Sequence, residues 1–296
     1  MYLFKLMSFK LLGIRNSSFA KAKSKTYSKK NTKLLFIVRA IIFLALTAIT
    51  QIGGVIYLIT LAITYNLKKH TFLFRSLIFI SLYIVATYIV TPKLAPYFGR
   101  EKISSTEFVQ AHSSFYSWTN RNYVTAELHQ VLQNMGKQLS KENSGIKLVY
   151  LDANFPFIDG FPLLPHRYHN DGKKIDVSFV YKDGQQITNK KPSFSGYGIY
   201  VNPLVNEWNQ INACLDTGYS QYDFTKFVTF GCINPQLQFS ESVNHKLLSD
   251  LILEEDVNTI FIEPHLVTRL GLENDKLVYH GCGTVRHDDH IHIEVK

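Results

Sequence analysis

The chain ends with "RHDDHIHIEVK", residues 286–296, which places three histidines and two aspartates within six positions. Side chains at alternate positions of an extended strand share one face. We therefore expect His290 and His292 on one face of a terminal strand. The isoleucines and valine that alternate with them, at 291, 293 and 295, should face the core on the other side. Two imidazoles spaced in this way converge on one small volume beside a sheet.

A second polar set lies in "PHRYHNDGKKIDVSF", residues 165–179. His169 precedes Asp176 by seven residues, and Gly172 allows a turn between them. Asp176 is expected at the start of a second strand, and His169 on the loop before it. If this strand is an antiparallel neighbour of the terminal strand, His169 and Asp176 can reach the same metal ion as His292. Zinc binds imidazole nitrogen and carboxylate oxygen, and a catalytic site needs three protein ligands and one open position. A single H-x-H pair more often lies on a solvated face of a strand. Two polar sets, each with a carboxylate nearby, favour a metal site instead.

The spacing of these residues resembles that of a known peptidase group. His169-x-x-Gly172-x-Lys174-x-Asp176 followed by His290-x-His292 is similar to the motifs of lysostaphin-type, D-Ala-D-Ala and hedgehog-like zinc peptidases. The run "HDDHIH" resembles the second motif of penicillin-insensitive murein endopeptidases, and residues 259–270 are similar to the segment that precedes it. The resemblance covers about residues 145–296.

The resemblance implies a role for each polar residue. The zinc (Zn2+) ligands would be His169, Asp176 and His292. His290 would act as a base or transition-state stabiliser beside them, supported by His287. Further residues could hold the ligand rings or contact substrate, or could be ordinary loop residues; these are His166, Arg167, Asp288 and Asp289.

Charge divides the chain into two parts. Residues 1–100 contain fifteen Lys and Arg and no acid, whereas the remainder holds seventeen basic and twenty-three acidic residues. The later part therefore lacks the clustered positive charge expected for nucleic-acid binding. Residues 1–33 are predicted to be a basic cytoplasmic tail, and the apolar runs at 34–66 and 72–90 are predicted to anchor the protein in a lipid bilayer.

The number of crossings, two or three, sets the side on which the later part lies. Positive charge favours the cytoplasm for both the tail and Lys68-Lys69, which requires a hairpin at the "QIGG" break, residues 51–54. The last span then delivers the domain to the periplasmic side of a bacterial inner membrane. With two crossings the domain would stay in the cytoplasm. We favour the periplasmic arrangement.

The remaining pattern predicts an α+β fold: a small, mostly antiparallel sheet with flanking helices, preceded by transmembrane helices. The expected division is a transmembrane region at 34–92, a helical linker at 93–145 and a zinc peptidase domain at 146–296. Strands are expected within 146–155, 173–182, 196–204, 259–266 and 290–295, and a helix at 243–256. Three cysteines, Cys214, Cys232 and Cys282, leave any disulfide pairing open.

The expected function is a membrane-anchored zinc metallopeptidase that cuts peptide bonds of peptidoglycan. One alternative is a D-Ala-D-Ala carboxypeptidase or dipeptidase. Another is a zinc-stabilised binding domain of the cell envelope without catalytic activity.

Overall fold

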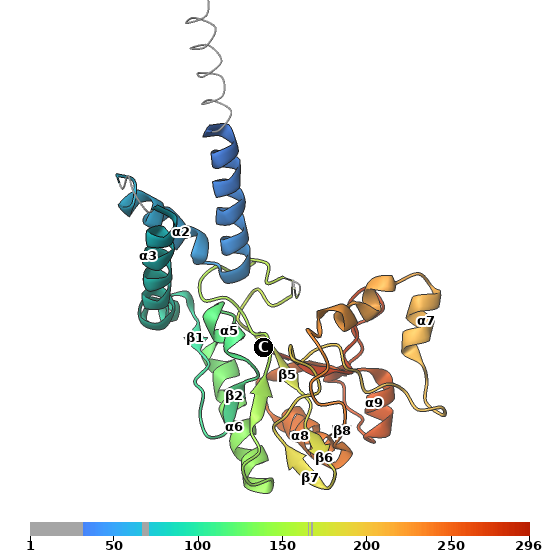
Figure 1. The fold of residues 1–296 in the computed structure, drawn as a ribbon. Coiled ribbons are helices and arrows are strands. Elements are labelled where there is room, and N and C mark those ends of the chain that lie inside the picture. The colour runs from blue at the N-terminus through green and yellow to red at the C-terminus, as the bar shows by residue number, and fades with distance from the viewer. Residues whose placement is uncertain (1–31, 67–70, 165, 167) are drawn as a thin grey trace, which may run out of the picture.

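The structure is a computed structural model of the protein and describes residues 32–66, 71–164, 166 and 168–296 (Figure 1). Two helices, Thr32–Thr50 and Phe72–Phe98, are long and apolar enough to cross a membrane. The first extends away from the folded domain. Nearly all of the predicted tail, and Lys68-Lys69, lie outside the described residues.

The second apolar helix is built from several segments and packs beside a shorter one. The shorter helix is α2 (Gly53–Ile63), which lies against α3 (Thr71–Val85). The chain then continues through η1 (Ala86–Val90), α4 (Thr91–Leu94) and η2 (Ala95–Phe98). With 11 residues, α2 is shorter than the roughly 20 that a full crossing needs.

The helix break expected at residues 51–54 is present. The first helix ends at Thr50, and Gln51 has a φ of 64°. The Gln51 side chain is buried, and its Oε1 accepts a hydrogen bond from the Phe157 backbone N at 3.0 Å. The turn between the helices is therefore attached directly to the folded domain.

A six-stranded sheet forms the centre of that domain, in the order β10-β9-β11-β5-β4-β2. In chain order, its strands are β2 (Val109–Ala111), β4 (Leu148–Tyr150), β5 (Lys174–Ser178), β9 (Val257–Phe261), β10 (Leu277–Val278) and β11 (His290–Val295). The terminal strand β11 is antiparallel to β5 on one side and to β9 on the other. The last residues of the chain therefore lie at the centre of the sheet.

The prediction of a small, mostly antiparallel sheet is wrong, because the sheet is mixed. β2 pairs with β4 in parallel, and β9 pairs with β10 in parallel. Parallel neighbours need a crossover connection, and helices supply it here: α6 (Ala126–Glu142) between β2 and β4, and α9 (Pro264–Arg269) between β9 and β10. Strands β2 and β10 are too short to give a readable alternation in the sequence.

The other elements surround this sheet. Two small sheets pair β1 (Glu101–Lys102) with β3 (Tyr123–Val124), and β6 (Tyr181–Asp183) with β7 (Gln186–Thr188) and β8 (Gln238–Phe239). The remaining helices are α5 (Ser114–Trp118), α7 (Gln210–Asp216), η3 (Ser220–Val228) and α8 (Glu241–Leu253). The expected helix at 243–256 corresponds to α8.

The strand expected at 196–204 does not form. Gly196 and Gly198 have φ values of 90° and 78°, which interrupt extended backbone. A Cβ on Gly198 would lie 2.3 Å from the Thr225 carbonyl oxygen. This close approach brings the segment against η3.

The hydrophobic core extends beyond the predicted domain boundary. Val109 of β2 and Leu128 and Val131 of α6 are buried in the same core as Ile175 and Ile293. Thr125 begins α6, with its Oγ1 accepting from the Leu128 backbone N. Part of the region predicted to be a helical linker, 93–145, therefore packs in the same core as the sheet.

Candidate metal centre

Strands β5 and β11 bring the two polar sets of the sequence together. In their antiparallel register His292 lies opposite Asp176, and His290 lies opposite Ser178. His292 Nδ1 is 2.9 Å from Asp176 Oδ1. Ile291 and Ile293 are buried in the core, as the alternation predicts. The neighbouring strand that the sequence interpretation required is therefore present.

His169 completes a triangle with these two residues. Its Nε2 is 3.2 Å from Asp176 Oδ1 and 3.2 Å from His292 Nδ1. Its Nδ1 lies 2.9 Å from the Ala153 carbonyl oxygen, to which only a protonated nitrogen can donate. This hydrogen bond leaves the Nε2 lone pair directed at the other two side chains, as metal-binding histidines require.

The dimensions of this triangle fit a small divalent ion. With zinc–ligand distances of about 2.0–2.1 Å, tetrahedral geometry separates the ligand atoms by about 3.3 Å. The three observed separations are 2.9, 3.2 and 3.2 Å. His169, Asp176 and His292 are also buried. The residues present therefore fit a metal ion with one coordination position left open.

His166 adjoins the same cluster. One ligand atom from each of His166, His169 and Asp176 lies within 4.8 Å of the others, so this group could hold a metal ion. His166 Nδ1 is 3.1 Å from Asp176 Oδ2 and 3.3 Å from Asp152 Oδ2. Burial lowers the pKa of His166, but these two carboxylates outweigh it and raise the pKa to about 10. His292 Nδ1 lies slightly nearer to Asp176, at 2.9 Å from Oδ1, so either His166 or His292 could complete a set of ligands with His169 and Asp176.

His290 faces the same carboxylate from the neighbouring position on β11. Its Nε2 is 3.5 Å from Asp176 Oδ1, and its Nδ1 donates to Asp289 Oδ1. Asp289 is itself fixed, since its Oδ2 accepts from the Gly198 backbone N. Burial lowers the pKa of His290, but Asp176 and Asp289 outweigh it and raise the pKa above its usual value. His290 is thus positioned to carry a proton.

His287 lies close to His290, with ring centroids 5.0 Å apart. Burial, together with the imidazoles of His290 and His292, holds the pKa of His287 well below its usual value. His287 is therefore neutral at neutral pH.

Two of the predicted supporting residues have other outcomes. Asp288 does not reach the cluster; it is buried and forms a two-pronged ion pair with Arg286. Asp288 and Asp289 lie in a bend before β11 and contact different partners, Arg286 and His290. Arg167 lies outside the described residues.

The sequence interpretation missed two contributions to the site. The Tyr197 hydroxyl donates to Asp176 Oδ2 at 2.7 Å. Arg121 forms a two-pronged ion pair with Asp152, the carboxylate beside His166. Both residues are far from the motifs in sequence, and no local spacing connects them.

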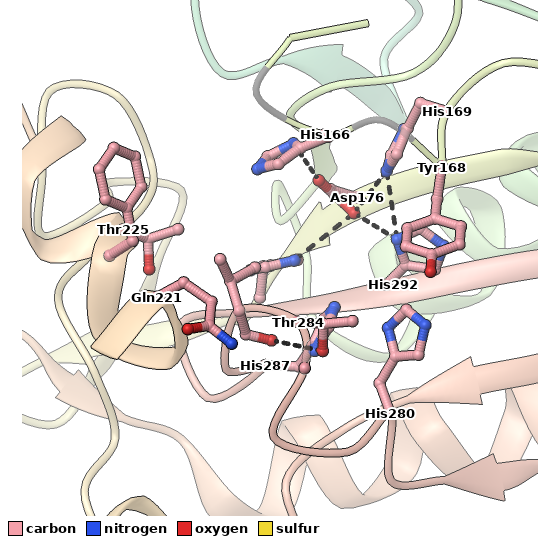
Figure 2. A pocket seen from close by; sticks show the side chains of 14 residues that line it. His166, Tyr168, His169, Asp176, Gln221, Thr225, His280, Thr284, His287 and His292 are labelled. Atoms are coloured by element: carbon pink, nitrogen blue, oxygen red, sulfur yellow. Dashed lines mark hydrogen bonds and ion pairs between the residues drawn. The ribbon is translucent and has the colours of Figure 1, made fainter. Parts of the chain in front are cut away.

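A cavity of about 490 Å³ gives access to the cluster. Figure 2 shows His166, His169 and His292 pointing toward Asp176, with Gln221 and Thr225 across the cavity. The opposite wall therefore comes from η3. A disulfide between Cys214 and Cys282 ties the neighbouring α7 to the segment before β11, and Cys232 is free and exposed.

Comparison of the chain with protein-family models finds no match, and comparison with curated proteins finds none either.

Proposed function

We propose that this protein is a membrane-anchored zinc peptidase that hydrolyses peptide bonds of peptidoglycan. The observation that carries the proposal is the convergence of His169 Nε2, Asp176 Oδ1 and His292 Nδ1 within 3.2 Å of one another. This set of donors and these spacings are those of catalytic zinc sites, which combine three protein ligands with an open position. The substrate class comes from the resemblance of "HDDHIH" to the murein endopeptidases.

The residues around the triangle supply the proton transfers. Zinc, when bound, supplies Lewis acidity toward a peptide carbonyl and a nucleophilic water. His290 would accept a proton from an attacking water at Nε2 and return it to the leaving amine, while Asp289 holds its Nδ1. Tyr197 donates to Asp176 and fixes the orientation of the carboxylate. His287, which stays neutral, packs beside His290 and does not compete for the proton.

Two observations support placing the domain on the extracytoplasmic side. The Cys214–Cys282 disulfide is typical of oxidising compartments. Both long apolar helices also end beside the domain, since Gln51 accepts from the Phe157 backbone N and the Phe98 ring lies 5.0 Å from the Phe157 ring. Helices that run in the same direction fit the three-crossing arrangement, although α2, with 11 residues, is shorter than a full return crossing needs.

The test uses the full chain in lipid nanodiscs, with zinc content and hydrolysis of cross-linked muropeptides as readouts. His169→Ala is expected to lose zinc and activity together. His290→Ala is expected to keep zinc and lose hydrolysis. His129→Ala is the control, because this histidine pairs with Glu101 away from the cluster. Hydrolysis by a zinc-free His169→Ala protein would contradict the proposal.

The same experiment separates the alternatives. A carboxypeptidase or dipeptidase would cleave free D-Ala-D-Ala stems in preference to cross-linked muropeptides. A binding domain without catalytic activity would retain zinc and show no hydrolysis in the unmodified protein.

A further inference from the structure

A second cavity, here called the apolar cavity, adjoins the metal centre. Its volume is about 470 Å³, within the range of small-molecule sites. Its apolar walls include Phe115, Leu164, Phe194, Val228 and Phe230. These side chains come from four separate regions of the chain and converge on one space.

Most of these wall residues expose large apolar areas at the mouth. Phe230 is 77% exposed, Phe194 59%, Leu164 49% and Phe115 48%. Phe230 also has a φ of 51°, an unfavourable conformation for a bulky residue and one that often marks a functional constraint. Apolar side chains gathered in this way mark a surface that another apolar body covers.

The apolar cavity lies next to the apolar helix Phe72–Phe98. Phe115 is on α5, and the Trp118 carbonyl oxygen at the end of this helix accepts from the Tyr83 hydroxyl. Just beyond it, Asn120 Nδ2 donates to Tyr83 Oη at 3.3 Å. Figure 1 shows α5 beside the domain-proximal end of α3. The wall of the cavity is thus continuous with the proposed anchor.

The inner end of the apolar cavity adjoins the metal centre. His166 lines both cavities, and Arg121 and Asp152 close the inner end of the apolar one. Arg121 pairs with Asp152 there, and His166 pairs with Asp152 and Asp176, so the charges at this end have partners within the protein.

We propose that the apolar cavity takes an acyl chain of a phospholipid from the adjoining bilayer. The proposal rests on the membrane anchoring proposed above, and not on zinc or hydrolysis. Transfer of each methylene group of the chain from water into this apolar space favours binding. A chain held there fixes the metal centre at the height of the lipid head groups.

The test is photolabelling of the full chain in nanodiscs that contain a phospholipid with a diazirine near the end of its acyl chain. Adducts are expected on residues 72–98, and also on residues 113–118 and 228–230. Leu164→Asp and Phe230→Asp place a charge at the mouth and should each reduce the cavity adducts at least about five-fold relative to the helix adducts. Leu253→Asp, an exposed leucine at the end of α8, is the matched control and should change neither.

Three outcomes would overturn the proposal. Adducts confined to residues 72–98 would support the membrane anchor and contradict the lipid site in the apolar cavity. Cavity adducts that persist in both mouth variants would mean that the label enters elsewhere. The absence of adducts on 72–98 as well would overturn the anchoring together with the lipid site. His169→Ala should label like the unmodified protein, so failure of the peptidase proposal would be recognised separately.

Discussion

Asp176 and His292 face each other across the antiparallel pair of β5 and β11, with 2.9 Å between carboxylate Oδ1 and imidazole Nδ1. The same carboxylate accepts from Tyr197 and lies near three further histidines. Burial raises the pKa of Asp176, but the surrounding imidazoles outweigh it and hold the pKa well below its usual value. A buried anion thus lies at the centre of a histidine cluster, which is the electrostatic requirement of a cation site.

Replacing this anion should remove the metal. Asp176→Asn keeps the shape of the side chain but removes its charge, so zinc affinity should fall at least about 100-fold, more than the loss of a supporting residue costs. Competition with a fluorescent chelator measures the affinity. Asp183→Asn, at a partly exposed aspartate paired with Lys190, should bind zinc normally. Equal affinities in the two variants would exclude Asp176 as a ligand.

The neighbouring residues Asp288 and Asp289 should give opposite phenotypes. Asp289→Asn presents an amide N–H to His290 Nδ1. Nδ1 must then accept this hydrogen bond, and the ring proton moves to Nε2. We expect zinc content to remain unchanged and the hydrolysis rate to fall about 10- to 100-fold.

Asp288→Asn should instead affect stability. It breaks a buried ion pair with Arg286, a loss that costs about 3–5 kcal/mol of unfolding free energy. Urea unfolding and zinc analysis of both variants provide the comparison. If Asp289→Asn were the less stable protein and Asp288→Asn the less active one, the assigned contacts would be wrong.

The buried Lys191 should make stability depend on pH. Its Nζ donates to the Phe179 carbonyl oxygen at 2.8 Å, and burial lowers its pKa to about 7. An unfolded lysine titrates near 10.4. Between about pH 7 and pH 10 the unfolded chain therefore binds a proton that the folded chain does not, and stability should rise with pH by up to about 1.4 kcal/mol per unit. Below about pH 7 both states are protonated, and this contribution is constant.

Comparison with Lys191→Met isolates this contribution. Unfolding free energies at pH 7 and pH 9 should differ less in Lys191→Met than in the unmodified protein. Lys190→Met, at the neighbouring exposed lysine, should retain the full difference. An unchanged pH dependence in Lys191→Met would assign the effect to another group.

The disulfide should stabilise the wall of the metal cavity. Cys214 and Cys282 are 68 residues apart, and a loop of this length stabilises the fold by about 4 kcal/mol in the chain-entropy model. The double variant Cys214→Ala with Cys282→Ala should therefore unfold at a lower urea concentration and be insensitive to dithiothreitol. Cys232→Ala should behave like the unmodified protein, since this thiol is free and exposed. A reductant-sensitive midpoint that persists in the double variant would contradict the pairing.

The parts of the fold that the sequence predicts are those with a strong local pattern. The alternation in 290–295 predicts β11 with its two faces, because isoleucines and histidines separate cleanly between core and site. The helical spacing at 243–256 likewise predicts α8. Both segments are long enough to show their period, two residues for a strand and about 3.6 for an α-helix.

The remainder depends on contacts between distant segments. The mixed sheet follows from crossovers that only tertiary packing selects, and its edge strand β10 has two residues. Tyr197 reaches Asp176 because Gly198 packs against η3, a relation that no spacing encodes. The Asp288 side chain points toward Arg286, and the position of Asp289 beside it in the sequence does not predict this direction.

Gly172 should connect the site to the membrane-proximal helix. It lies between His169 and Asp176 with a φ of 82°, and a Cβ at this position would lie 2.3 Å from Arg100 Nε. Arg100 lies two residues after the end of η2 and pairs with Asp159. Gly172→Ala should therefore combine backbone strain with displacement of the Arg100 side chain, and we expect weaker zinc binding as well as lower stability.

Gly184→Ala separates the two causes, because Gly184 has a φ of 63° and open space where its Cβ would lie. Its strain alone should cost about 1 kcal/mol. Gly172→Ala should cost about 1–3 kcal/mol more, the usual range for an overpacked site. Urea unfolding and zinc titration measure both effects. If the two alanine variants lost equal stability and both kept full zinc affinity, then Arg100 would not constrain the loop that carries His169, and the helix end would have no mechanical connection to the metal centre.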